Sequence, residues 1–168
     1  MAIKPLIPIT HPLIRTELPE FQFIRKEDGL TNAVDYAYEL VENMVHYDGI
    51  GLAANQIGDP YRVFCVASNP VLVCFNPFIA DFSSEMVTLE EGCLTYPGLI
   101  VKVTRPKSIK IRFIQPNGEA RNESYTGMTA RIMQHELEHL NGKRFFDNVD
   151  WWEKEKVKKW FKKHQKKK

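Results

Sequence analysis

The stretch MTARIMQHELEHL at residues 128–140 decides how this chain is expected to fold, because it combines helical periodicity with a metal-binding pattern. The pattern is H-E-x-x-H, formed by His135, Glu136 and His139. Residues four apart lie one turn apart on one face of a helix, so both imidazoles can reach one ion, and Glu136 can accept a proton from water. The alternative is a surface helix that binds nothing. We favour the metal site, because the neighbouring apolar residues predict a half-buried helix, in which unpaired His and Glu are costly.

The rest of the chain predicts strands in the middle and helices towards both ends. A helix over residues 31–47 is indicated by apolar residues at helical spacing, namely Val34, Tyr38, Val41 and Val45. Asp150 is expected to cap a further helix that begins at Trp151. Strands are predicted at residues 62–67, 71–75, 86–90, 108–114 and 119–125. This arrangement indicates an α+β domain.

Length and composition indicate one globular domain with a basic end. The chain has 168 residues, and no apolar run is long enough to span a membrane. Residues 1–16 resemble neither a secretory signal nor a transit peptide, so we expect a cytoplasmic protein, although a protein trimmed of an organellar presequence would look the same. Nine Lys and two Glu lie between residues 153 and 168. We therefore divide the chain into a catalytic domain, 1–150, and a basic C-terminal helix and tail, 151–168.

A catalytic ion held by two histidines needs a third protein ligand. The downstream position that supplies a His in some H-E-x-x-H proteins is occupied by Phe145, so the ligand is expected from upstream. Cys93 is the best candidate, because it follows a predicted strand and Gly92, and a thiolate is a strong ligand for borderline divalent ions. Taken alone, Cys93 is equally well explained as a buried structural thiol.

Another segment, GIGLAANQ at residues 49–56, combines two glycines and two alanines with an amide. The small residues allow the backbone to approach a neighbour or a substrate closely, and Gln56 offers a hydrogen-bond donor beside them. In isolation this segment is more typical of a helix end followed by a tight turn.

Together the three segments resemble the peptide deformylases. That family has the motif G-φ-G-φ-A-A-x-Q, matched by residues 49–56, and E-G-C-φ-S, matched by residues 91–95. Its third motif, Q-H-E-x-x-H-L-x-G, is matched by residues 134–142, and the likeness extends from about residue 12 to residue 147. One position departs from the family pattern: Thr95 stands where Ser is usual, which keeps the hydroxyl.

The resemblance implies antiparallel sheets wrapped around the central H-E-x-x-H helix, and hydrolytic removal of the formyl group from the initiator methionine of new polypeptides. It implies a metal held by Cys93, His135 and His139, naturally Fe²⁺, with Zn²⁺, Ni²⁺ or Co²⁺ able to replace it. Glu136 would carry the proton, and the Gln56 amide and the Leu94 N–H would donate to the developing oxyanion.

We expect the glycines to form a corner that admits a formyl group and rejects an acetyl group, with an apolar pocket for methionine beside it. The expected substrate contacts are Gly49, Ile50, Gly51, Leu89, Glu91, Gly92, Met128 and Ile132. The expected partners are N-formylmethionyl nascent peptides and ribosomal RNA, which the Lys-rich tail would contact, and we expect a monomer with no membrane contact. The rival interpretations are a small metallopeptidase that uses the same motif and a non-catalytic RNA-binding module that rests on the tail alone.

Overall fold

The computed structural model describes residues 3–29 and 31–165. The helices in this part of the chain are α1 (Asn32–His46), α2 (Gly127–Leu140) and α3 (Trp151–Gln165), with short 3-10 turns at Pro12–Arg15 and Ala54–Ile57. The strands are β1 (Gly51–Ala53), β2 (Val63–Val66), β3 (Leu72–Phe82), β4 (Met86–Glu91), β5 (Val101–Pro106), β6 (Ser108–Ile114) and β7 (Ala120–Thr126). None of these helices has both the length and the apolar character that a membrane span requires.

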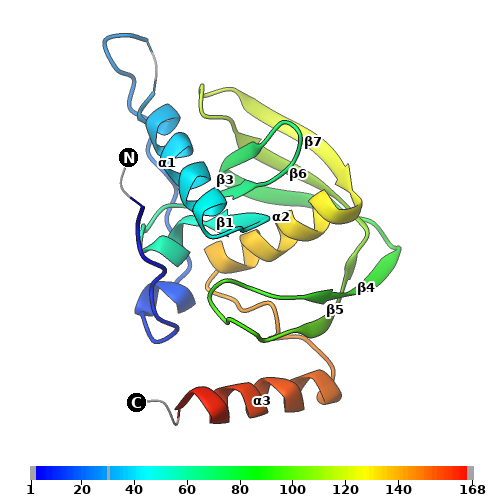
Figure 1. Ribbon diagram of the computed structural model, residues 1–168. Coiled ribbons are helices and arrows are strands. Elements are labelled where there is room, and N and C mark those ends of the chain that lie inside the picture. The colour runs from blue at the N-terminus through cyan, green and yellow to red at the C-terminus, as the bar shows by residue number, and fades with distance from the viewer. Residues whose placement is uncertain (1–2, 30, 166–168) are drawn as a thin grey trace.

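Two antiparallel sheets enclose α2. The larger sheet has the strand order β1-β2-β3-β6-β7, and the smaller one consists of the β4–β5 hairpin. In Figure 1, α2 lies between the two sheets, α1 covers the side of β1, and α3 lies below the hairpin. The expected α+β fold, with antiparallel sheets around the H-E-x-x-H helix and helices towards both ends, is confirmed.

Strand β2 shows why the sequence contains a continuous apolar run at this point. Val63 and Cys65 point to the cluster formed with α1, whereas Phe64 and Val66 point to the cluster formed with α2. Alternate residues of a strand face opposite sides of a sheet, so a strand covered on both sides is apolar at every position. β2 is therefore the layer on which both helices pack.

The predicted helix over residues 31–47 is present as α1, but its buried face is not the one that the apolar spacing suggested. The buried residues include Ala33, Ala37, Leu40 and Met44, while Tyr38 and Val45 are exposed. The alanines let α1 lie close to the sheet, and the tyrosine on this face is Tyr36.

Three strands differ from the sequence predictions. Residues 51–53 form β1 although a turn was expected there, and β5 was not predicted at all. β1 has only three residues, too few for a periodic pattern, and it depends on pairing with β2. β3 runs to Phe82, well beyond the predicted end at residue 75, with register shifts opposite β6.

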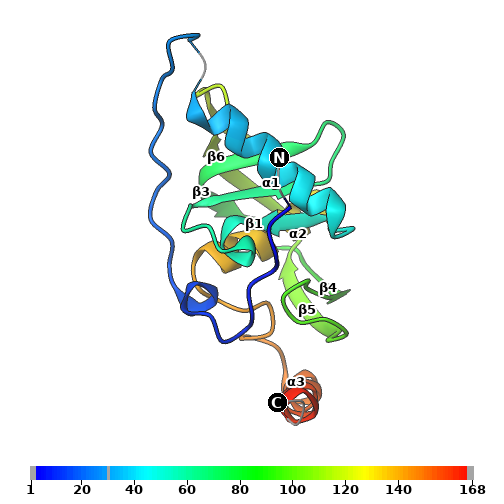
Figure 2. The same cartoon turned by 60° about the vertical axis from the view of Figure 1, so that its left-hand side comes forward.

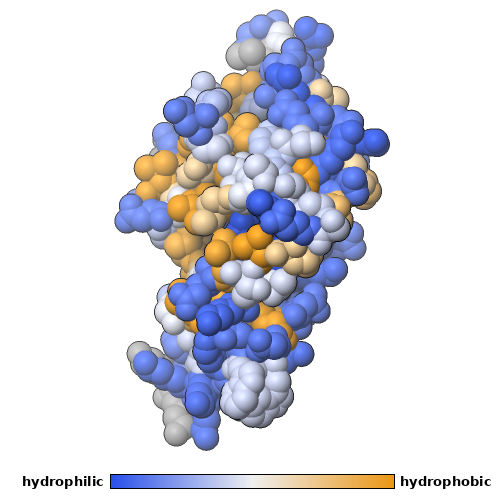
Figure 3. Space-filling view, turned by 90° about the vertical axis from the view of Figure 1, so that its right-hand side faces the viewer, coloured by the Kyte–Doolittle hydropathy of each residue, from blue (hydrophilic) through white to orange (hydrophobic). Residues whose placement is uncertain are grey.

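Helix α3 begins where predicted, and Asp150 caps it by accepting a hydrogen bond from Glu153 N at 3.0 Å. Its inner face places Val157 and Trp160 in an apolar cluster with residues of the hairpin and its loop. Its outer face carries the lysines, and hydrophilic residues cover most of the lower end of the molecule, where α3 lies (Figure 3). Figure 2 shows α3 end-on, beneath the hairpin.

Candidate active site and metal centre

Helix α2 carries His135, Glu136 and His139 towards the space between the two sheets. All three side chains are buried, and the two imidazole rings lie 5.2 Å apart between centroids. Buried His and Glu side chains need partners or a ligand, because an unpaired polar group costs free energy. Nδ1 of His139 and Oε2 of Glu136 have no hydrogen-bond partner in the described part of the chain.

Cys93 completes a group of possible metal ligands with the two histidines. It lies in the loop of the β4–β5 hairpin, and its Sγ is 3.2 Å from Nε2 of His139. One ligand atom from each of Cys93, His135 and His139 lies within 4.8 Å of the others. Burial raises the pKa of the Cys93 thiol, but the two histidines outweigh this effect and hold that pKa well below its usual range. One thiolate and two imidazoles form a donor set that suits Zn²⁺ or Fe²⁺.

A buried charge cluster fixes the orientation of His135. Nδ1 of His135 lies 2.9 Å from Oε2 of Glu91, which leaves Nε2 free to face the other ligands. Arg105 donates to both oxygens of Glu91, at 2.6 and 2.9 Å, and also to both oxygens of Glu138, at 2.9 and 3.0 Å. Burial would raise the pKa of Glu91, but hydrogen bonds from His135 and Arg105 lower it to about 2. Glu91 is therefore a permanent carboxylate behind His135.

Glu136 occupies a position that depends on a glycine in the neighbouring strand. A Cβ atom at Gly51 would lie 2.5 Å from Oε1 of Glu136 and 2.6 Å from Cγ2 of Ile132. Only glycine therefore lets β1 pass this close to α2 while Glu136 faces the pocket. Burial raises the pKa of the Glu136 carboxyl to about 7.

The Gln56 amide is held in a fixed orientation. Its Oε1 accepts a hydrogen bond from Ala53 N at 2.9 Å, and its Nε2 donates to Oγ1 of Thr95 at 3.0 Å and lies 3.7 Å from Sγ of Cys93. Thr95 therefore uses the hydroxyl that it shares with the usual Ser. Close by, the N–H of Leu94 has no hydrogen-bond partner within the described residues.

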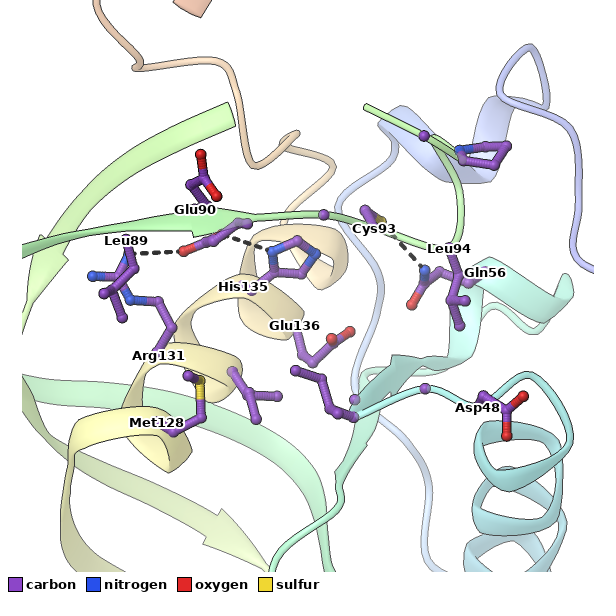
Figure 4. A pocket seen from close by; sticks show the side chains of 18 residues that line it. Asp48, Gln56, Leu89, Glu90, Cys93, Leu94, Met128, Arg131, His135 and Glu136 are labelled. Carbon is purple, nitrogen blue, oxygen red and sulfur yellow. Dashed lines mark hydrogen bonds and ion pairs between the residues drawn. The ribbon is translucent and has the colours of Figure 1, made fainter. Parts of the chain in front are cut away.

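A cavity of about 450 Å³ opens above these groups. The predicted catalytic, metal-binding and substrate-contact residues all line it except His139, whose Nε2 lies 3.2 Å from Sγ of Cys93. Figure 4 shows Glu136 and His135 from α2 facing Gln56 and Cys93 across this space. Ile50 comes from the segment before β1, Leu89 from β4, and Met128 and Ile132 from α2, so three elements supply the apolar part of the wall.

Comparison with known proteins identifies the family. The family model for polypeptide deformylase matches residues 3–155. The chain belongs to the peptide deformylase family. It is therefore an enzyme of the hydrolase class. The peptide deformylase of Thermotoga petrophila is 40% identical over 125 residues, covering 73% of this chain and 74% of the relative. That of Brucella suis is 32% identical over 169 residues, covering 97% and 94%.

Solved deformylase structures have the same fold. The crystal structure of peptide deformylase from Thermotoga maritima superposes with a TM-score of 0.82 at 32% identity, covering 89% of this chain and 99% of that one. The family is one of metalloenzymes, which agrees with the grouped thiol and imidazoles of Cys93, His135 and His139.

Some residues of this deformylase site were missed from the sequence. Arg105, Glu138 and Arg131 form the charge cluster behind His135; the two arginines lie outside the three motifs, and Glu138 stands at a variable position of the third. A signal was present: Arg105 follows Val101 and Val103 in an alternating pattern, so it had to face inwards with them. Arg131 stands among apolar residues of α2, where a charged side chain needs buried partners.

Proposed function

We propose that this enzyme removes the formyl group from N-formylmethionine at the start of newly made polypeptides and releases formate. The observation that carries the proposal is the grouping of Cys93, His135 and His139 beside the buried Glu136 carboxylate at one wall of an apolar cavity. Membership of the deformylase family supports the same substrate class.

Cys93, His135 and His139 would hold one divalent ion. The donor set fits such an ion, and we propose Fe²⁺ as the natural metal, with Zn²⁺, Ni²⁺ or Co²⁺ able to replace it. When bound, the ion polarises a carbonyl oxygen and makes water a better nucleophile. Glu91 and Arg105 hold the His135 ring in the orientation that this requires.

Glu136 is the proposed proton carrier. It accepts the proton of the attacking water and later delivers it to the leaving amine nitrogen. Its buried position and the partnerless Oε2 support this role, because no neighbouring donor holds that oxygen. The oriented Gln56 amide and the Leu94 N–H are the proposed donors to the developing oxyanion, each worth about 3 kcal/mol of barrier.

The glycines support selectivity for a formyl group. A Cβ atom at Gly92 would lie 2.8 Å from Cδ1 of Ile100, and one at Gly49 would lie 3.2 Å from Cδ1 of Leu94. We propose that this crowded corner rejects the extra methyl of an acetyl group. The apolar walls supplied by Ile50, Leu89, Met128 and Ile132 would take the methionine side chain.

The basic helix α3 is the basis for a second proposal, which concerns a partner other than the substrate. Lysines on the outer face of α3 are exposed, and a polybasic helix binds phosphates, so we propose that it contacts ribosomal RNA where nascent chains emerge. We keep the division into a catalytic domain, 1–150, and a basic helix and tail, 151–168, as part of this proposal; residues 166–168 lie outside the described part of the chain. We further propose a monomer that works in the cytoplasm or in an organelle.

Formate release decides between the proposals. The enzyme is loaded anaerobically with Fe²⁺ and given formyl-Met-Ala, with Glu136→Gln as the matched control. We expect formate from the wild type and a loss of 10²- to 10⁴-fold in kcat in the variant at equal metal content. Cleavage of the Met–Ala bond instead would indicate a metallopeptidase. Absence of any hydrolysis, together with binding of RNA, would indicate the non-catalytic module.

A further inference from the structure

Arg131 lies on α2 one turn before His135, at the wall of the cavity. Figure 4 shows its side chain between Leu89 of β4 and Met128 of α2. Although it is charged, the residue is only 5% exposed. A buried guanidinium has to use its donors on fixed acceptors, so its contacts determine which elements it joins.

The guanidinium of Arg131 joins α2 to both strands of the hairpin. Its Nη2 donates to the carbonyl oxygen of Val87 in β4 at 2.5 Å, and its Nη1 donates to that of Val103 in β5 at 2.8 Å. Nη1 also donates to Oε1 of Glu91 at 2.9 Å, at the end of β4. One planar group therefore fixes three points of the hairpin relative to the helix.

The hydrogen bonds of Arg131 connect the two elements that form opposite walls of the apolar pocket. Leu89 forms the wall on the hairpin side, and Met128 and Ile132 form the wall on the α2 side. The hairpin is a two-stranded sheet, which has little stability without packing against another element. Leu89 lies two residues beyond Val87 in β4. The distance between Leu89 and α2 therefore depends on the hydrogen bond by which Arg131 holds Val87.

We propose that Arg131 is a positioning residue that sets the width of the methionine pocket. Its side chain lines the cavity, while its guanidinium is occupied by the hairpin carbonyls and Glu91, so it acts through β4 and not on the reacting atoms. Arg131 thereby determines which side chain the enzyme accepts on the formylated first residue of the substrate. This inference rests on the proposed deformylase function.

The test compares two substrates and three variants. Arg131→Met keeps the apolar stem and removes the guanidinium, Arg131→Lys keeps the charge and removes the fork, and Arg112→Met is a control on the exposed face of β6. kcat and KM are measured for formyl-Met-Ala, which fills the pocket, and formyl-Ala-Ala, which does not. In both Arg131 variants we expect the ratio of the two kcat/KM values to fall about tenfold, mainly through KM for formyl-Met-Ala. The Arg112 control keeps the wild-type ratio.

Amide hydrogen exchange supplies a readout that needs no activity. Faster exchange confined to residues 86–91 and 101–106 in the Arg131 variants would support the inference. An unchanged selectivity ratio would overturn it. Equal losses with both substrates, or faster exchange throughout the five-stranded sheet, would make Arg131 a residue of general stability and would also overturn it. If the wild type released no formate from either substrate, the proposed function would fail, whereas the exchange result would still report on the Arg131 link.

Discussion

Replacing Gly51 with alanine tests whether the close approach of β1 to α2 serves the reaction. The added Cβ would lie 2.5 Å from Oε1 of Glu136 and 2.6 Å from Cγ2 of Ile132. The backbone at Gly51 lies outside the left-handed region, so alanine is compatible with its conformation. Oε1 of Glu136 is at the end of a flexible side chain and can move aside, whereas Cγ2 of Ile132 is bonded directly to Cβ, so the Ile132 side chain has to rotate or α2 has to shift slightly.

The size of the expected effect follows from these distances. An ordinary contact begins at 3.4 Å, so Oε1 of Glu136 has to move by 3.4 − 2.5 Å, or 0.9 Å. A misplacement of this size in a reacting group costs about 100-fold in rate. We therefore expect Gly51→Ala to lower kcat about 100-fold, which corresponds to about 2.7 kcal/mol of activation free energy.

The assay is formate release from formyl-Met-Ala at equal metal content, with thermal unfolding measured in parallel. Gly118→Ala is the matched control, because Gly118 has a φ of +89° in the β6–β7 turn, far from the site. We expect this control to lose about 1 kcal/mol of stability and to keep its kcat. A Gly51→Ala enzyme with more than half of the wild-type kcat would refute the reasoning. So would a loss of activity that merely follows a loss of stability.

Three further predictions concern other parts of the site and the fold. Thr95→Val removes the acceptor for Nε2 of Gln56 and should lower kcat/KM about tenfold, whereas Thr95→Ser should stay near the wild type in the same kinetic assay; equal values for both would contradict the role of the hydroxyl. Cys93→Ser should lower metal content, measured by elemental analysis. We expect free metal at 100 times its Kd to stabilise the wild type by about 2.7 kcal/mol, and this gain should be lost in the variant. Burial would raise the pKa of Asp147, but its hydrogen bonds with Arg144 lower it. The stability that this carboxylate contributes is therefore fully present above the unfolded-state pKa of about 3.9 and is lost as the pH falls through the lower folded-state value. In urea unfolding, Asp147→Asn should be less stable than the wild type at pH 7, with a difference that shrinks in acid; a constant difference would exclude the ion pairs as its cause.

Most of the site residues were predicted from the three sequence motifs. Each of the three motifs supplies residues to the wall of one cavity: Gln56 comes from the first, Cys93 from the second and Glu136 from the third. The spacing of His135 and His139 also predicted the helix that positions them, since it matches one helical turn.

The features that the sequence did not predict depend on which face of a helix or strand packs against a neighbouring element. The apolar spacing in α1 did not reveal that Ala33 and Ala37 face the sheet, because the requirement for small residues comes from the neighbouring strands. β1 is too short for a pattern of its own, so the reason for Gly51, its approach to Glu136, emerges only in three dimensions. Arg105 was missed because β5 was not recognised as a strand.

The centre is built from two units that are separable in principle. Cys93 and Glu91 come with the hairpin, whereas His135 and His139 come with the helix packed on the large sheet. Partial opening of a protein proceeds through cooperative units whose free energies are smaller than that of global unfolding. Undocking of the hairpin would therefore dismantle the ligand set while the rest of the native structure persisted. If Cys93, His135 and His139 hold an ion as proposed, this sub-global opening would be a route for its release, and the rate of ion exchange would report on the opening.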